Sequence, residues 1–434
     1  MSVGVFAGAT SFIPLNMLRT LDTYPEFRET LRGVEAGFGD ADGASLRDLV
    51  LGGDGPKYLR DHPDPALPSL VQIATALGAY AVGQRAGTGP AVLLGHSFGE
   101  ITALVAAGAF LPADGARIVR TRMRLAKQVM DLGGMTALDI GAARATSLLE
   151  TVASASLRVA CHNTPRSTVV SGTLDDLQLV DRLAGLLGIR AVRLPVRFAY
   201  HSPVMASLVD TLRQELAASG IHQRPLRTPV HCVFHNRRHT DQDDLLGHIA
   251  EMYVRPVLFA ESLRTLHSEG IDRYLDYGGD GTITRMVEAT LPAVQVTSPI
   301  PGPASAAAPE PSTVPAAAEP EDIAIPYRQA PAVENAERSA RPAVAESVPS
   351  LVREDLLAEL ATMYAEVVGY PADVFTEDVD LEADLGIDSL RQVAVLTKVT
   401  ERFGLARTEI KLSDYPTLGS VADSVTAQLA GGSR

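Results

Sequence analysis

Two serines in this chain lie in sequence contexts that make a hydroxyl group reactive or accessible. Ser97 lies in Gly-His-Ser-Phe-Gly over residues 95–99, directly after the short apolar run 91–94. Such a turn puts the serine on a strained corner at the start of a helix, whose free N–H groups face a developing oxyanion. Ser389 lies in Gly-Ile-Asp-Ser-Leu over residues 386–390. The patterns predict a nucleophile and a modification site, against the plainer alternatives of a Gly-rich turn and a helix cap.

A nucleophilic serine needs a general base, and the chain has ten histidines. His96 is adjacent to Ser97, but its side chain points away from its neighbour at a turn of this kind. His201 follows the last strand expected in residues 134–195 and precedes a helix. The residues alone rank His201 only modestly above a structural loop histidine.

Bulk composition excludes several classes of protein. A length of 434 residues predicts two or three domains, and a net charge of −14 argues against non-specific nucleic-acid binding. Cys161 and Cys232 give no disulfide framework, and no cysteine/histidine cluster has zinc spacing, so we expect no metal. We also expect no signal peptide, no apolar stretch of the ~18–20 residues that a membrane helix needs, and a cytoplasmic location.

The composition changes near residue 299, which predicts the domain boundaries. Residues 299–350 are rich in proline and alanine and keep no hydrophobic period, so we expect an extended linker. Residues 1–298 alternate short apolar runs with amphipathic stretches, which predicts an α/β fold with a hydrolase-like, mostly parallel sheet. Within them, residues 134–195 follow a βαββαβ pattern, typical of an inserted ferredoxin-like subdomain. Residues 351–434 predict an all-α four-helix bundle.

Residues 1–298 resemble a malonyl-CoA:acyl-carrier-protein transacylase or the acyltransferase domain of a polyketide synthase. The matching segments are residues 95–100, 103–108, 162–165, 169–172, 201–203 and 255–257. The resemblance implies a catalytic dyad of Ser97 and His201, with His201 oriented by a backbone carbonyl near Met252. It also implies an oxyanion hole made by the backbone N–H groups of Phe98 and Ala9.

The resemblance extends to the substrate pocket. Arg122 lies 25 residues after Ser97, where the family has an arginine that pairs with the free carboxylate of a malonyl-type group. In isolation, Arg122 would be taken for a solvated helix arginine. Bulky Tyr200 resembles the malonyl type, which leaves little room for an α-methyl group. The other expected pocket residues are Phe198, Leu67, which replaces a family glutamine, and His96.

Residues 351–434 resemble an acyl carrier protein over their full length. The resemblance rests on residues 381–390 and on Tyr-Pro-Thr-Leu over residues 415–418. It implies that a phosphopantetheinyl transferase attaches 4′-phosphopantetheine to Ser389. The implied partners are acyl-CoA, as the thioester substrate, and a ketosynthase or other polyketide enzymes, with no nucleic acid and no membrane.

Together these features predict that the chain transfers a malonyl-type acyl group from CoA, through an acyl-enzyme on Ser97, to a carrier arm on Ser389. Two other classes stay open. One is a serine hydrolase, either an editing thioesterase or a patatin-like lipase, since Asp280-Gly281 imitates the lipase Asp-Gly pair. The other is a non-catalytic scaffold that only binds a partner of the carrier. Loading of a non-malonyl acyl unit is also open.

Overall fold

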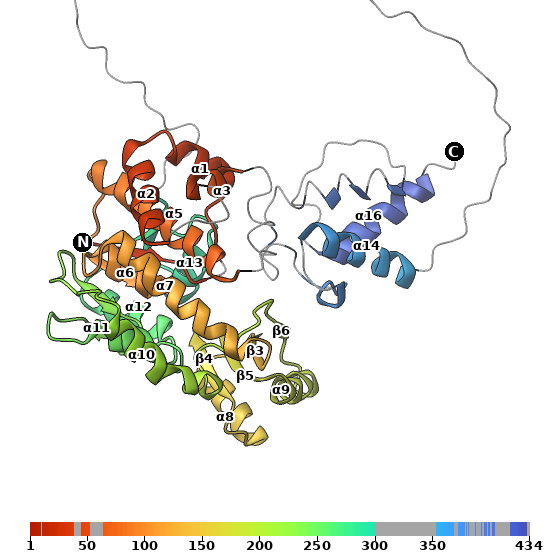
Figure 1. The fold of residues 1–434 in the computed structure, drawn as a ribbon. Helices are drawn as coiled ribbons and strands as arrows, with labels where there is room; N and C mark the ends of the chain where they lie inside the picture. Colours follow the sequence, from red (N-terminus) through yellow and green to blue (C-terminus); the bar gives the residue numbers. More distant parts are fainter. Residues whose placement is uncertain are drawn as a thin grey trace, which may run out of the picture. The chain divides into compact units, whose positions relative to one another are not determined.

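A computed structural model describes most of the chain. The described residues are 1–9, 11–38, 45–52, 64–299, 353–368, 372–377, 379, 381, 387, 392, 395–396, 398–399, 402–403 and 417–431. The chain divides into two compact units, Met1–Ala306 and Ala307–Arg434 (Figure 1). Ser389 and residues 300–350 of the expected linker lie outside the described residues.

A six-stranded sheet lies at the centre of the first unit, in the order β10-β9-β1-β2-β7-β8. Its strands are β1 (Ser2–Phe6), β2 (Val92–Gly95), β7 (Val230–Cys232), β8 (Arg237–Arg238), β9 (Arg273–Asp276) and β10 (Gln295–Thr297). All neighbours are parallel except β8, which returns antiparallel to β7. β1 and β2 are apolar and buried along nearly their whole length, as expected of parallel strands covered on both faces.

Helices cover this sheet. They are α1 (Leu15–Leu21), α2 (Pro25–Phe38), α3 (Leu46–Leu51), α5 (Ala66–Arg85), α6 (Gly99–Ala106), α7 (Pro112–Ala126), α10 (Val209–Ala218), α11 (Leu245–Glu251), α12 (Phe259–Ser268) and α13 (Thr282–Thr290), with 3-10 turns at Lys127–Val129 and Pro203–Leu208. Contrary to the sequence expectation, α5 is long and apolar enough to cross a membrane. Because 89% of its apolar window is buried inside the unit, it has the character of a central core helix.

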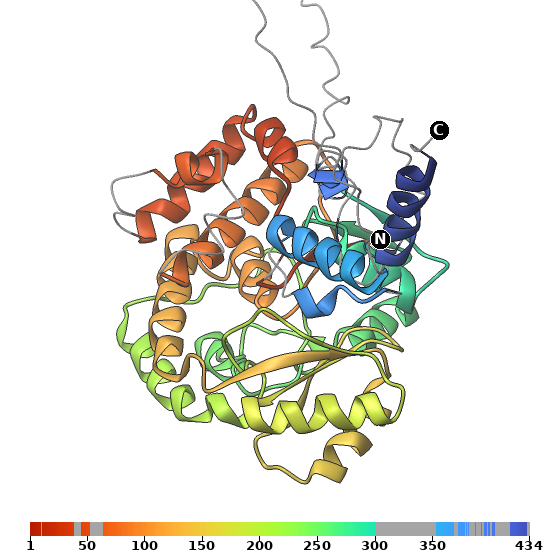
Figure 2. The same cartoon turned by 90° about the vertical axis from the view of Figure 1, so that its right-hand side faces the viewer.

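A second, four-stranded sheet is inserted between α7 and the 3-10 turn at Pro203–Leu208. Its elements follow one another as β3 (Gly133–Leu138), α8 (Ala142–Val152), β4 (Arg158–His162), β5 (Thr168–Thr173), α9 (Leu174–Leu186) and β6 (Ala191–Arg193). The strand order is β4-β5-β3-β6 and all pairings are antiparallel, which is the ferredoxin-like arrangement. Figure 2 shows α8 and α9 together below the strands of this sheet.

In the second unit the structure describes α14 (Arg353–Val368), a 3-10 turn at Ala372–Val374 and α16 (Leu418–Gly431). Apolar side chains of α14 and α16, with Phe375, form a separate small core. Ile387, two residues before Ser389, is fully buried in that core, and its N–H donates to the Leu381 carbonyl at 2.8 Å. The sequence predicts a helix over 389–402 and a short turn near 410–415, and both segments fall largely outside the described residues, so the four-helix bundle stays a prediction.

Candidate active site

Ser97 lies on a sharp turn between β2 and α6. Its φ of +51° is unusual for a residue with a side chain. The flanking glycines permit this turn, because a Cβ on Gly95 would lie 2.1 Å from the Glu100 nitrogen and one on Gly99 would lie 2.3 Å from the Phe6 carbonyl oxygen. The strained turn holds the Ser97 hydroxyl clear of the backbone at the carboxyl edge of the sheet.

His201 meets Ser97 from the loop that follows the inserted sheet. The Ser97 Oγ and the His201 Nε2 are 2.7 Å apart, although 104 residues separate them in sequence. His201 also has a left-handed backbone, with φ of +62°, and its N–H donates to the Tyr253 carbonyl at 2.7 Å. The other ring nitrogen, Nδ1, is 2.9 Å from the Arg255 carbonyl oxygen, to which it donates. This tautomer leaves Nε2 free to accept the serine proton.

The orienting carbonyl differs from the sequence expectation. The hydrogen bond falls on Arg255, three residues beyond Met252, and the Met252 carbonyl acts on the ring more weakly. The shift arises because α11 ends at Glu251 and the chain then turns, which brings the later carbonyl to the ring. Any residue can supply such a carbonyl, so the side-chain sequence carries little information about which one does.

Burial and nearby positive charge keep His201 neutral. Burial, followed by the charges of Arg122 and His96, lowers the pKa of His201 to about 3, while the Arg255 carbonyl acts in the opposite direction. No carboxylate pairs with His201 among the described residues. The ring is therefore deprotonated and ready to accept a proton at neutral pH.

The two predicted oxyanion donors lie in the loops after β2 and β1, two neighbouring strands whose last residues, Gly95 and Phe6, pair in the sheet. Phe98 follows Ser97 directly at the N-terminus of α6, and Ala9 lies in the loop after β1. Within the described part of the chain, neither backbone N–H has a hydrogen-bond partner. Two free N–H groups and the positive end of a helix suit a developing negative charge. Their role as an oxyanion hole stays a prediction.

Gln72, on α5, supports the loop that carries Ala9. Its side-chain amide donates to the Ala7 carbonyl at 3.2 Å and to the Gly8 carbonyl. Gln72 is 4% exposed within an otherwise apolar helix. Gln72 is not among the site residues predicted from the sequence, although a lone amide in a long apolar stretch is a signal that could have indicated it.

Arg122 is buried on α7 and has no acidic partner in the described residues. Its Nη1 donates to the Ile249 carbonyl at 2.6 Å, and its guanidinium lies 4.3 Å from the centre of the Tyr253 ring. The Tyr253 hydroxyl in turn donates to the Arg122 carbonyl. A buried guanidinium without a carboxylate is costly unless an anion joins it, which distinguishes Arg122 from the solvated arginine of the alternative interpretation.

Aromatic side chains surround this arginine. Tyr200 stacks against Tyr253, with ring centres 6.3 Å apart, and contacts Phe198 at 5.2 Å. Burial raises the pKa of Tyr200, so its hydroxyl stays protonated. Leu67 is buried in the main core at the start of α5. The pocket roles of Tyr200, Phe198 and Leu67 stay predictions.

His96 turns away from Ser97, as the sequence analysis expected of a residue at this turn. Its Nε2 lies 2.8 Å from Asn163 Oδ1, and its ring packs edge-on against Phe259. Burial lowers the pKa of His96, so it is neutral and donates to the amide oxygen. Asn163 follows β4 of the inserted sheet, so this contact joins the two sheets beside the site.

Comparison with protein families gives two matches. Residues 17–299 match a family described as "Acyl transferase domain", and residues 358–425 match "Phosphopantetheine attachment site". The second match indicates a covalently attached 4′-phosphopantetheine, which suits the serine motif around Ser389.

The curated relatives are much longer than this chain. Spectinabilin polyketide synthase system protein NorC of Streptomyces orinoci is 38% identical over 204 residues, covering 47% of this chain and 9% of the relative. Erythronolide synthase EryA3 of Saccharopolyspora erythraea is 31% identical over 272 residues, covering 61% and 8%. The chain thus spans less than a tenth of either relative.

Solved structures share the fold. The acyltransferase domain from module 8 of the salinomycin polyketide synthase is 27% identical, with a TM-score of 0.61, covering 68% of this chain and 70% of that one. An acyl-carrier-protein S-malonyltransferase from Burkholderia pseudomallei has a TM-score of 0.63 at 23% identity, covering 69% and 96%. The likeness to the malonyltransferase concerns the fold alone.

Proposed function

Because the chain belongs to the acyl transferase domain family and carries a phosphopantetheine attachment domain, we propose that it loads a malonyl-type group onto its own carrier domain. The donor is the CoA thioester, and the reaction passes through an ester on Ser97. The polyketide synthase relatives support a place in polyketide biosynthesis. Its partners are then a phosphopantetheinyl transferase and a ketosynthase or another polyketide enzyme that receives the loaded unit.

In the first half-reaction, Ser97 Oγ attacks the thioester carbonyl carbon while His201 Nε2 takes the serine proton. The N–H groups of Phe98 and Ala9 stabilise the oxyanion of the tetrahedral intermediate. The carbon–sulfur bond then breaks, and His201 returns the proton to the departing CoA sulfur. The Arg255 carbonyl stabilises the transiently protonated imidazole ring and fixes its orientation.

In the second half-reaction the same residues work in reverse. The carrier arm supplies a thiol as acyl acceptor. His201 Nε2 takes the proton of the incoming thiol and later gives it to Ser97 Oγ as the ester breaks. The tether between the two domains raises the effective concentration of the acceptor near Ser97, which favours loading within one chain.

The observation that carries the malonyl assignment is the buried Arg122, which has no acidic partner in the described part of the chain. A guanidinium binds a carboxylate through two parallel hydrogen bonds and stays charged in a closed site. A free carboxylate on the acyl group satisfies this geometry, whereas an acetyl group leaves the arginine unpaired. The aromatic rings of Tyr200 and Phe198 favour a small substituent at the α-carbon.

Two alternative functions fit the geometry less well. A patatin-like lipase pairs its serine with an aspartate, but Asp280 accepts from the Thr282 N–H at 2.9 Å, while Ser97 faces His201. A scaffold has no use for a neutral histidine aligned on a serine. An editing thioesterase stays the strongest rival, because it needs the same dyad and differs only in the final acceptor.

Intact-mass measurement tests the proposal directly. The unmodified full chain with malonyl-CoA should gain one malonyl group, and that group should be absent from Ser97→Ala. After treatment with a phosphopantetheinyl transferase, a second malonyl group should appear, and Ser389→Ala should abolish it. Release of free malonate without any carrier loading would instead support the thioesterase, and no covalent gain with any acyl-CoA would support the scaffold.

A further inference from the structure

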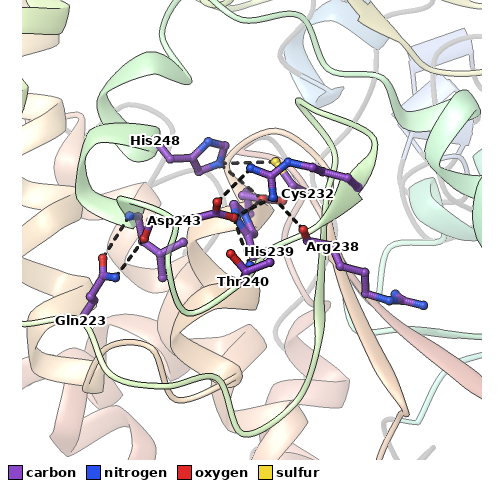
Figure 3. Close-up of polar contacts among 10 residues, drawn as sticks. Gln223, Cys232, Arg238, His239, Thr240, Asp243 and His248 are labelled. Carbon is purple, nitrogen blue, oxygen red and sulfur yellow. Dashed lines mark hydrogen bonds and ion pairs between the residues drawn. The ribbon is translucent and has the colours of Figure 1, made fainter.

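A second cluster of reactive side chains lies one helical turn beyond Ser97, where four elements converge. Its members are Glu100 on α6, Cys232 at the end of β7, His239 after β8 and His248 on α11. Figure 3 shows Cys232, His239 and His248 turned toward one another, with Asp243 beside His239. The four residues are 0%, 0%, 6% and 8% exposed, respectively.

One donor atom from each residue faces a common point. The four atoms all lie within 4.8 Å of one another. The Glu100 Oε1 is 3.4 Å from the His248 Nε2 and 2.8 Å from the His239 Nε2, and the Cys232 Sγ is 3.8 Å from the His248 Nε2. Zinc bond lengths place tetrahedral ligand atoms roughly 3.3–3.7 Å apart, so a bound ion requires only sub-ångström shifts.

The surroundings also suit a metal centre. The His239 Nδ1 donates to Asp243 Oδ2 at 3.3 Å, which leaves Nε2 facing the cluster. Asp243 is itself held by Arg237, at 2.7 and 3.0 Å, and by the Thr240 N–H at 3.1 Å. A carboxylate behind a histidine is the usual outer support of a metal-bound imidazole.

One buried atom in the cluster is left without a partner. The Glu100 Oε2 has no hydrogen-bond partner in the described residues, although its side chain is fully buried. A buried carboxylate oxygen without a partner costs free energy. A metal ion bound by Glu100 through one or both oxygens would offset that cost.

From this geometry we propose that Glu100, Cys232, His239 and His248 form a structural zinc site. A thiolate, two imidazoles and a carboxylate match the ligand preferences of Zn²⁺, and the absence of an exposed position favours a structural ion over a catalytic one. The ion links the helix that follows Ser97 to β7, β8 and α11. It thereby stabilises the turn that carries the serine, without taking part in acyl transfer.

The sequence predicts no metal, because no cysteine/histidine cluster has the short spacings of familiar zinc motifs. Three ligands lie within residues 232–248, but in no familiar zinc pattern, and Glu100 is more than 130 residues away in sequence. The parallel pairing of β2 with β7 brings Glu100 beside the others, because α6 follows β2 directly. Only the folded structure reveals the set of four.

Metal analysis of the full chain tests the proposal. Protein purified from zinc-supplemented medium and dialysed should retain about one zinc ion per chain. Cys232→Ala should reduce this to less than about a tenth, because the thiolate is the strongest ligand. Cys161→Ala is the matched control, since Cys161 is also a buried free cysteine but lies on β4 outside the cluster. This control should keep its zinc.

Cobalt substitution provides a readout that does not depend on whether the variants fold. Wild-type protein exchanged with Co²⁺ should show the intense visible absorption of a tetrahedral site and a thiolate charge-transfer band. A chelator should lower its melting temperature. If zinc-exposed wild type binds no metal, or if Cys232→Ala binds as much as wild type, the proposal is wrong. The cluster is then a metal-free ion-pair network. None of these readouts depends on acyl transfer.

Discussion

Two buried histidine sites lie next to each other along α6, and they differ in whether their surroundings favour a positive charge on the histidine. At the start of the helix, His201 faces the hydroxyl of Ser97 and the carbonyl of Arg255. One turn later, His239 faces the carboxylates of Glu100, at 2.8 Å, and Asp243, at 3.3 Å. Both rings are almost fully buried, so burial alone does not distinguish them.

The charged groups around each ring distinguish the two histidines, as the pKa shifts of His201 and His239 indicate. Burial first, and then the positive charges of Arg122 and His96, lower the pKa of His201 to about 3, and no carboxylate among the described residues pairs with the His201 ring. Burial also lowers the pKa of His239, but hydrogen bonds and charges of Glu100 and Asp243 outweigh it and raise the pKa above its usual value. The first site therefore disfavours a bound proton, while the carboxylates of the second site favour a cation there, either a proton or the proposed zinc ion.

The largest effect is expected at the first site from Ser97→Ala. Removing the nucleophile should lower acyl-enzyme formation by about 10⁴-fold or more, because no other described hydroxyl lies within reach of His201. Rapid-quench labelling with radiolabelled malonyl-CoA, before carrier modification, measures this rate. Labelling at the wild-type rate would show that another residue is the nucleophile.

Replacing the base should have the next largest effect. His201→Ala should slow acylation by about 10³-fold, since both serine activation and protonation of the leaving thiol are lost. His231→Ala is the matched control, because His231 is also a buried histidine with a lowered pKa but bonds Asn236 instead of Ser97. An equal loss in both variants would indicate that the effect is structural.

Replacing Arg122 tests whether the positive charge at the first site binds the carboxylate of the acyl group. Arg122→Ala should reduce the preference for malonyl-CoA over acetyl-CoA by about 30-fold or more, since losing a buried charge-assisted pair costs ~2–5 kcal/mol. Competition between the two thioesters, followed by mass measurement of the acylated protein, gives the ratio. An unchanged ratio would mean that the arginine does not bind the carboxylate of the acyl group.

The contrast between the sites also explains how far the sequence could predict them. Residues near Ser97 carry a local pattern, because the turn requires glycine on both sides, and the structure places the predicted His201 against it at 2.7 Å. The hydrogen-bonded carbonyl of Arg255 was missed because any residue can supply a carbonyl. Gln72 stands out as a lone amide in an apolar stretch, but its partners are backbone carbonyls, so the sequence does not show which loop it supports.

The same distinction between local and long-range information applies to the fold. The βαββαβ order of the inserted sheet follows from local periodicity, whereas the neighbours β1, β2 and β9 are set by long-range pairing that no local pattern reveals. The cluster around Glu100 depends on that pairing and was invisible in the sequence. Ser389 and most of the segments expected at 389–402 and 410–415 lie outside the described residues, so the prediction for them rests on the resemblance and the family match alone.

At the second site, Glu100→Gln should destabilise the fold. An amide cannot supply the negative charge that His239 and His248 face, so the free energy of unfolding should fall by about 1–3 kcal/mol, measured by urea denaturation. The control is Asp131→Asn, which removes a carboxylate from the exposed pair with Arg197 and should change stability too little to detect. Equal stability of Glu100→Gln and wild type would mean that the buried carboxylate is not needed to hold a cation.

The smallest expected effect is an absence of pH dependence at the first site. Since the pKa of His201 is lowered to about 3, chiefly by burial and then by Arg122, the ring stays neutral throughout pH 5–8 and the acylation rate should be flat. A histidine with its ordinary pKa of about 6.5 would lose roughly 30-fold at pH 5. The same shift predicts that stability is highest above pH 6.5 and falls as pH drops toward 3, because the unfolded chain then binds a proton that the folded chain excludes. Stopped-flow acylation across pH 5–8 checks the rate, and Arg122→Ala should move the acid limb upward by removing a nearby positive charge. An acid limb near pH 6.5 in wild type would show that His201 is more solvated than its buried position implies.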